Sequence, residues 1–179
     1  MGSLPHSRID ALSAIVLPPL SDYAVILLVE DLADDVELVR RAFTKAAVPN
    51  PIHIVRSGEE ALKYLSGTEM YANRAEHPLP DLILLDLHMP GMDGFEVLAW
   101  IRAQPGIRTI PVVVLTSSDL VWDVNRAYEL GASSFLVKPI DFQNYTELGR
   151  LVANYWLKAV KTPESFRPPS TRNGRPKKS

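Results

Sequence analysis

The sequence predicts an α/β fold, a doubly wound parallel sheet of five strands in the order 2-1-3-4-5. Three observations lead to this prediction. Five short apolar runs of strand length alternate with five longer segments in which apolar residues recur at helical spacing. The runs 25–29 and 82–85 are apolar without interruption, as strands buried on both faces are. Strands that alternate with helices form parallel sheets with right-handed crossovers.

Each element has its own signal in the sequence. The predicted strands are 25–29, 52–55, 82–85, 111–115 and 134–137. The predicted helices have their apolar positions within 36–46, 61–65, 95–101, 120–130 and 142–156. The last helix is long and amphipathic, with more apolar residues than one sheet face requires. Helices on both sides of the strands are therefore expected.

Helix ends and loops follow from capping and turn residues. Ser57, with Glu60 three residues later, predicts an N-cap for the second helix. The first helix is expected to use Asp31 or Asp34 as its cap. The segment 67–80 is polar and rich in helix breakers, which predicts a long surface loop.

The chain of 179 residues suits one domain with tails. We expect an N-terminal extension at 1–22, a folded domain at 23–160 and a basic flexible tail at 161–179. The apolar run 11–17 is too short to span a bilayer, so no membrane association is expected. Cysteine is absent, which excludes disulfides and thiolate metal sites. A cytoplasmic location is consistent with this composition.

Charge is divided unevenly along the chain. It has 19 basic and 21 acidic residues, and 166–179 holds five of the basic residues and none of the acidic ones. The remainder therefore has 14 basic against 21 acidic residues, a net charge of −7. An acidic body argues against a nucleic-acid partner.

Reactive side chains follow four of the five predicted strands. These are Glu30 and Asp31 after the first strand, Asp86 after the third, Thr116 after the fourth and Lys138 after the fifth. The C-terminal ends of parallel strands lie along one edge of a sheet, where ligands bind. We therefore expect these side chains to meet in one water-facing pocket.

The chemistry of this set points to phosphoryl transfer. Clustered carboxylates repel one another, and Mg²⁺, which prefers oxygen ligands, relieves that repulsion. A carboxylate attacks phosphorus to form an acyl phosphate, and a lysine and a hydroxyl stabilise the transferred group. Taken alone, each residue has an ordinary structural role, such as a helix cap for Thr116 or a solvated charge for Lys138. Together they predict that Asp86 is a nucleophile that accepts a phosphoryl group.

The motifs resemble those of the receiver domain of bacterial two-component response regulators, over about 24–160. They are Val-Glu-Asp at 29–31, Pro-Asp-Leu-Ile-Leu-Leu-Asp-Leu-His-Met-Pro-Gly-Met-Asp-Gly at 80–94, Val-Val-Val-Leu-Thr-Ser at 112–117 and Val-Lys-Pro at 137–139. The resemblance implies a flavodoxin-like three-layer sandwich. It also implies a phosphoacceptor signalling protein, with autophosphorylation and autodephosphorylation chemistry, rather than an enzyme.

The resemblance assigns further roles. Asp86 would take a phosphoryl group from a sensor histidine kinase. Besides Asp86, the Mg²⁺ ligands would be Asp31 directly, Glu30 through water and the backbone carbonyl of His88. Thr116 and Phe135 would form a switch that reshapes the surface of the fourth helix, fifth strand and fifth helix. A cis peptide bond is expected before Pro139.

A narrower similarity is to single-domain regulators paired with phytochrome-type sensor kinases, which the long loop 67–80 and the segment 154–163 suggest. No DNA-binding output domain is expected after the last helix. Apolar surface on that helix predicts a homodimer through the fourth helix, fifth strand and fifth helix. His88, two residues after Asp86, and Ser118, two after Thr116, are expected to modulate the phosphoryl lifetime.

Other functional classes fit the sequence less well. Aspartyl-phosphate phosphatases resemble Asp-x-Asp at the nucleophile, whereas the second position here is His88. A flavodoxin-like FMN carrier needs a phosphate cradle after the first strand, where Glu30, Asp31, Asp34 and Asp35 would repel the phosphate. The Gly-x-Gly-x-x-Gly motif of dinucleotide enzymes is absent there. A pseudo-receiver that only binds a partner would not need the complete set of site residues.

Overall fold

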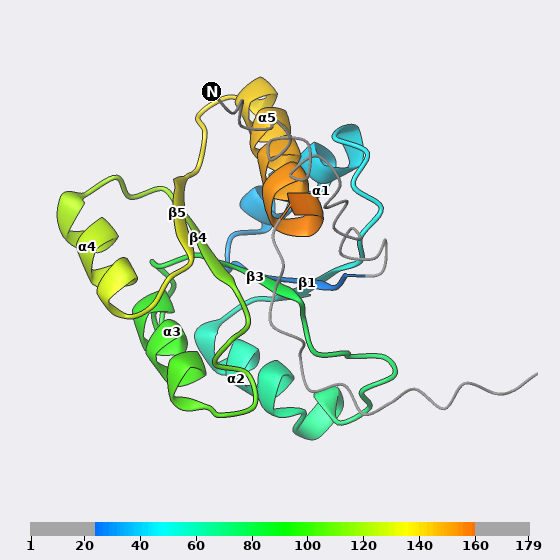
Figure 1. Ribbon diagram of the computed structural model, residues 1–179, viewed down its shortest axis with the longest axis vertical. Coiled ribbons are helices and arrows are strands. Elements are labelled where there is room, and N and C mark those ends of the chain that lie inside the picture. The colour runs from blue at the N-terminus through cyan, green and yellow to red at the C-terminus, as the bar shows by residue number, and fades with distance from the viewer. Residues whose placement is uncertain (1–23, 160–179) are drawn as a thin grey trace, which may run out of the picture.

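The computed structural model describes residues 24–159. Its strands form one parallel sheet in the order β2-β1-β3-β4-β5, which confirms the predicted fold. The strands are β1 Ile26–Val29, β2 Ile52–Val55, β3 Leu82–Leu85, β4 Val112–Thr116 and β5 Ser134–Val137. The α-helices are α1 Ala33–Lys45, α2 Gly58–Ser66, α3 Gly94–Ala103, α4 Val121–Glu129 and α5 Phe142–Val152. Helices α1 and α5 pack together on one side of the sheet, with α2 and α3 on the other (Figure 1).

Register in the sheet determines which loop residues lie side by side. In the β1–β3 pair, Val29 is opposite Leu85, the last residue of its strand. Glu30 and Asp86 therefore leave the sheet at the same level, on adjacent strands. In the β4–β5 pair Thr116 is the last paired residue, and its carbonyl accepts a hydrogen bond of 2.8 Å from the backbone N–H of Lys138.

The core lies in two layers, one on each face of the sheet. Successive residues of β1 alternate between them: Leu28 packs into the layer beneath α1 and α5, and Leu27 into the layer beneath α2 and α3. Both are at most 1% exposed. Burying such a side chain contributes about 1.5–3 kcal/mol. Burial on both faces explains why β1 and β3 read as uninterrupted apolar runs.

The helix caps confirm one prediction and correct another. The Oγ atom of Ser57 accepts a hydrogen bond of 3.1 Å from the backbone N–H of Glu60, as an N-cap does. The N-cap of α1 is Leu32, whose side chain makes no capping hydrogen bond, so the expectation that Asp31 or Asp34 caps this helix is wrong. The carboxylate of Glu30 instead accepts from the N–H of Leu32 at 3.2 Å.

The segment 67–80 is not simply a surface loop. It contains a short 3-10 helix, η2 Glu69–Tyr71, and Tyr71 is buried with its ring centroid 5.2 Å from that of Tyr64. The hydroxyl of Tyr64 donates to the carbonyl of Pro78 at 2.9 Å. The guanidinium of Arg74 donates to backbone carbonyls at the end of α2. The polar composition of this segment concealed the buried ring of Tyr71.

Helix α4 is more exposed than its apolar spacing predicts. Leu120, the first apolar position of the predicted helix, precedes the helix as its N-cap and is 63% exposed. Of the α4 residues, only Asp123 and Ala127 are buried. After α5 the chain continues in a π-helical segment, Ala153–Ala159.

The described part of the chain contains no helix whose length and apolar character would suffice to cross a bilayer. The expected extension at 1–22 and the expected tail at 161–179 lie outside the described residues.

Candidate functional site

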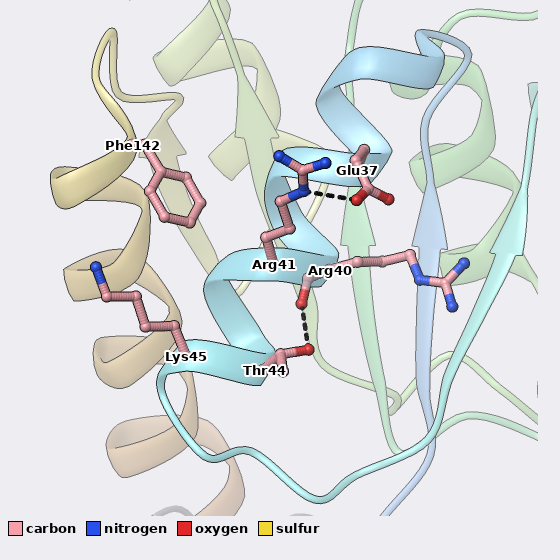
Figure 2. Close-up of a pocket in the computed structure, with 6 residues that line it drawn as sticks. All are labelled: Glu37, Arg40, Arg41, Thr44, Lys45 and Phe142. Carbon is pink, nitrogen blue, oxygen red and sulfur yellow. Dashed lines mark hydrogen bonds and ion pairs between the residues drawn. The ribbon is translucent and has the colours of Figure 1, made fainter.

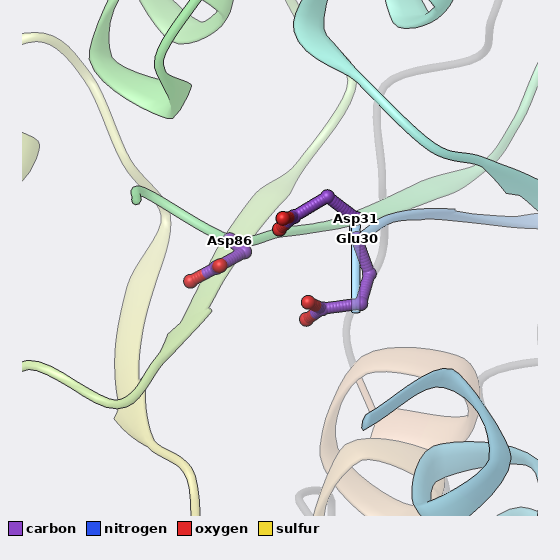
Figure 3. Close-up of side chains that lie close together, drawn as sticks. All are labelled: Glu30, Asp31 and Asp86. Atoms are coloured by element: carbon purple, nitrogen blue, oxygen red, sulfur yellow. The ribbon is translucent and has the colours of Figure 1, made fainter. Parts of the chain in front are cut away.

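Three carboxylates converge where β1 and β3 end. Glu30, Asp31 and Asp86 each offer an oxygen atom, and these atoms all lie within 4.8 Å of one another (Figure 3). The parallel register of the two strands produces this arrangement, because Glu30 and Asp86 follow paired residues. The sequence prediction that these acids meet is thus confirmed in space.

The donor set fits a hard divalent cation. All three side chains offer oxygen, which Mg²⁺ and similar ions prefer. The Oδ1 atom of Asp31 is buried and has no hydrogen-bond partner among the described residues. An unpaired buried carboxylate oxygen is costly, and a bound cation would satisfy it.

The site is less open to water than expected. The side chains of Glu30 and Asp86 are 1% and 6% exposed, and only Asp31 of the three acids is half-buried. The Oδ1 atom of Asp86 also accepts a hydrogen bond of 2.9 Å from the N–H of Leu87, which orients the carboxylate.

Lys138 reaches the carboxylates from the end of β5. Its Nζ atom lies 2.6 Å from Glu30 Oε2, 2.7 Å from Asp35 Oδ2 and 3.6 Å from Asp86 Oδ2. Burial alone would lower the pKa of Lys138, but the hydrogen bonds to Asp35 and Glu30 and the charge of Asp86 raise it above its ordinary value. The lysine is therefore a permanent cation within the acidic cluster.

Burial raises the pKa of Glu30 to about 7, although the hydrogen bond and charge of Lys138 act in the opposite direction. The negative charge of Asp86 contributes to this increase. A cation bound between the carboxylates would reduce their mutual repulsion and favour the charged form of Glu30.

Asp35 belongs to the cluster, although the sequence analysis did not place it there. It lies in the first turn of α1, four residues after Asp31. A second pair of acids, Asp34 and Asp35, closely follows Glu30 and Asp31 after the same strand, and this is the signal that could have found it. Its ion pair with Lys138 joins positions 103 residues apart.

The two predicted switch residues lie on neighbouring strands, Thr116 at the end of β4 and Phe135 in β5. Thr116 is fully buried, and its hydroxyl accepts a hydrogen bond of 3.4 Å from the backbone N–H of Ser118. Within 24–159 no hydrogen bond joins this hydroxyl to the three carboxylates. Phe135 is half-buried against a small cluster made by Leu87, Phe95, Val114 and Ala127. The peptide bond before Pro139 is trans, so the predicted cis bond is wrong; trans is the more stable isomer of most such bonds.

His88 and Ser118, the predicted modulating residues, converge on a third residue. The ring of His88 lies with Nε2 2.9 Å from Asp123 Oδ2, and Ser118 Oγ lies 2.5 Å from the same oxygen. Asp123 is buried in the first turn of α4, and the sequence analysis did not single it out. A single acidic residue in the first turn of a helix is common, so the sequence contains no pattern that predicts these contacts of Asp123.

Close packing positions the loop that carries Asp86. A Cβ atom added to Gly94 would lie 2.1 Å from the carbonyl oxygen of Asp86 and 2.7 Å from Leu87 Cα. Asp93 and Glu96 form a capping box at the start of α3, which holds this glycine at the helix entry. The absence of a side chain at Gly94 is therefore required by the approach of α3 to the acceptor loop.

A groove of about 540 Å³ between α1 and the start of α5 is a separate feature (Figure 2). It is lined by Glu37, Arg40, Arg41, Thr44, Lys45 and Phe142. Two of its cations already have partners: Arg41 pairs with Glu37 at 2.7 Å, and Lys45 lies 5.4 Å from the ring centroid of Phe142. None of the site carboxylates lines this groove, so the chemistry is assigned to the strand ends.

Comparison with known proteins identifies the family. The model of the response regulator receiver domain matches residues 26–148. Response regulator Rcp1 of Synechocystis sp. is 38% identical over 139 residues, which cover 78% of this chain and 92% of Rcp1. The solved structure of the phosphorylated cyanobacterial phytochrome response regulator RcpA has a TM-score of 0.73 and 36% identity and covers 79% of this chain and 99% of RcpA.

A second solved structure, the Mn²⁺-bound form of Rcp1, has a TM-score of 0.71 and 38% identity, and covers 78% of this chain and 99% of that chain. These similarities agree with the five-stranded sheet and with the acidic cluster at its strand ends. The chain belongs to the response regulator receiver family, and it is a two-component signalling protein.

Proposed function

We propose that this protein accepts a phosphoryl group on Asp86 from a sensor histidine kinase, in a reaction that requires Mg²⁺. The convergence of Glu30, Asp31 and Asp86 with the ammonium of Lys138 is the observation that supports this proposal. The cation would be held by the three carboxylates and by the backbone carbonyl of His88. When bound, it would neutralise charge on the phosphoryl oxygens.

Different residues of the chain have different roles in the transfer. A carboxylate oxygen of Asp86 attacks phosphorus, an O–P bond forms, and the N–P bond to the kinase imidazole breaks. The departing imidazole nitrogen keeps the electron pair and takes a proton. Lys138 shifts from its carboxylate partners toward the new negative charge, and Thr116 donates its hydroxyl to a phosphoryl oxygen.

The output is a change of surface shape. Thr116 turns toward the phosphoryl group, and Phe135 follows into the space that it leaves, which alters the surface of α4, β5 and α5. This is a local change of charge that shifts an equilibrium between two conformations. We assign this switch to the receiver domain, with signalling through its own surface.

The similarity to RcpA suggests a phytochrome-type sensor kinase as donor. Because histidine kinases use ATP, we place the reaction in the cytoplasm. Transfer from a purified phytochrome-type kinase, compared with an unrelated histidine kinase at equal concentration, tests the pairing. Equal transfer rates from both kinases would contradict it.

We further propose a homodimer through α4, β5 and α5. Large apolar side chains are exposed on these elements, on the loop after β5 and on the π-helical segment after α5: Val121, Trp122, Tyr128, Val137, Ile140, Leu151 and Tyr155. Exposed apolar side chains of this size are typical of interaction surfaces. Sedimentation velocity of wild type and Trp122→Glu tests it; a wild type that stays monomeric with and without phosphorylation would refute it.

The central test is incubation with acetyl phosphate and Mg²⁺, followed by intact mass measurement. Wild type should gain the mass of one phosphoryl group, and Asp86→Asn should gain none. Asp119→Asn, which changes an exposed acid in the loop after β4, is the matched control and should behave as wild type. A folded wild type without any mass gain would overturn the proposal.

A further inference from the structure

One carboxylate joins the two loops that border the phosphoryl site. Asp123 Oδ2 lies 2.9 Å from His88 Nε2 and 2.5 Å from Ser118 Oγ, and 3% of the Asp123 side chain is exposed. His88 is two residues after Asp86, and Ser118 is two residues after Thr116. A single buried oxygen therefore connects the loop after β3 to the loop after β4.

An ordinary role in helix capping does not account for this geometry. An acidic residue in the first turn of a helix usually points into solvent. It stabilises the helix because its negative charge lies near the free backbone N–H groups. The oxygen of Asp123 instead faces side chains from two other segments. Ser118 Oγ also accepts a hydrogen bond of 3.3 Å from the N–H of Leu120, the N-cap residue of α4. Burial of a carboxylate is costly without such partners.

The same contacts extend to Thr116. Its hydroxyl accepts a hydrogen bond from the N–H of Ser118, whose Oγ donates to Asp123. A continuous path therefore runs from Thr116 through Ser118 and Asp123 to His88. When the Thr116 hydroxyl turns toward a phosphoryl group, the Ser118 N–H loses this acceptor, so the path is sensitive to the state of Asp86.

We propose that Asp123 is a positioning residue that holds His88 and Ser118 away from the phosphoryl group on Asp86, and so lengthens the lifetime of the acyl phosphate. This inference rests on the proposed function. Hydrolysis breaks the O–P bond to Asp86, forms a bond from phosphorus to a water oxygen, and releases inorganic phosphate and a proton. A free imidazole or hydroxyl beside the site orients that water; while Asp123 holds both groups, neither is available.

The test is the decay of the phosphorylated protein. Wild type and variants are loaded with acetyl phosphate and Mg²⁺, the donor is removed, and the phosphorylated fraction is followed by intact mass. Asp123→Ala should lose the phosphoryl group about three- to tenfold faster than wild type, as expected for the loss of one to two hydrogen bonds. Asp123→Asn should be intermediate, because its amide oxygen still accepts from Ser118.

A triple variant separates positioning from general loosening of the fold. When His88→Ala and Ser118→Ala are added to Asp123→Ala, the freed side chains are gone and the lifetime should return to that of wild type. The control Asp119→Ala, on an exposed residue of the same loop, should decay as wild type. If Asp123→Ala does not fold, the isosteric Asp123→Asn carries the test alone.

Two results would overturn the inference. One is a lifetime of both Asp123 variants equal to or longer than that of wild type. The other is a triple variant that decays as fast as Asp123→Ala, since a merely structural role predicts that outcome. If wild type itself takes no phosphoryl group, the proposed function fails; if it does and the lifetimes are equal, only the positioning role fails.

Discussion

The ammonium nitrogen of Lys138 lies 2.7 Å from the Asp35 carboxylate, on the first turn of α1. In the same structure it lies 3.6 Å from Asp86. Asp35 thus competes with the phosphoryl acceptor for the lysine, and it ties α1 to the end of β5. The ion pair has consequences for both stability and phosphorylation.

Replacing Asp35 with Asn removes a partner of a buried ammonium while keeping the size of the side chain. Glu30 remains paired with Lys138, so the expected loss is about 1–3 kcal/mol in the free energy of unfolding, measured with urea. The freed lysine should also speed the loading of Asp86 by acetyl phosphate. Asp34→Asn, on the exposed neighbouring residue, is the control and should change neither quantity.

Gly94→Ala should disturb the acceptor loop directly. The new Cβ would lie 2.1 Å from the carbonyl oxygen of Asp86, so either α3 or the loop must move. We expect a loss of about 1–3 kcal/mol in unfolding free energy and slower phosphoryl loading. Gly106→Ala has no atom within 4 Å of its new Cβ and serves as the control. Equal stability of the two variants would show that the close approach is unimportant.

Mg²⁺ should stabilise the folded protein, because the unfolded chain has no assembled carboxylate site. At a concentration of about 100 times the dissociation constant the expected gain is about 2.7 kcal/mol, measured as an increase in Tm. Asp31→Asn should lose most of this increase. Without metal the same variant should be at least as stable as wild type, because it removes a buried charge with an unpaired oxygen. A metal-dependent increase that Asp31→Asn leaves intact would place the ion elsewhere.

Acid should destabilise the protein through His53, on the edge strand β2. Its ring lies 5.7 Å from that of Tyr64 and 6.3 Å from that of His77. Burial lowers the pKa of His53 below its ordinary value of 6.5, and the charge of His77 lowers it further. As pH falls, His53 therefore takes up a proton in the unfolded chain before it does so in the folded protein. The contribution of neutral His53 to the free energy of unfolding is present above pH 6.5 and is lost below it.

The measurement for His53 is Tm between about pH 7.5 and about pH 5.5. The decrease should be smaller in His53→Phe than in wild type, because the group that titrates differently in the two states is gone. His77→Phe removes only the effect of the His77 charge on the pKa of His53. Its decrease in Tm should therefore lie between those of wild type and His53→Phe. Identical slopes for wild type and His53→Phe would rule out this histidine as the source.

The sequence by itself determined the fold class and the ends of the sheet at which chemistry occurs. Uninterrupted apolar runs such as 82–85 require burial on both faces, and a parallel sheet under helices provides it. Reactive residues directly after such runs must share one edge of the sheet, so the sequence is enough to pair Glu30 with Asp86. These inferences depend only on local periodicity and on chain order.

Only the tertiary structure decided which partners the charged groups choose. Lys138 turns to Asp35 as well as to Glu30, the carboxylates are largely covered, and Asp123 holds His88 and Ser118 with one oxygen. Each contact depends on how a helix sits against loops that are distant in sequence, 103 residues away in the case of Lys138 and Asp35. Apolar periodicity specifies the buried face of a helix, but the contacts of a single polar side chain follow from packing angles and distances that it does not encode.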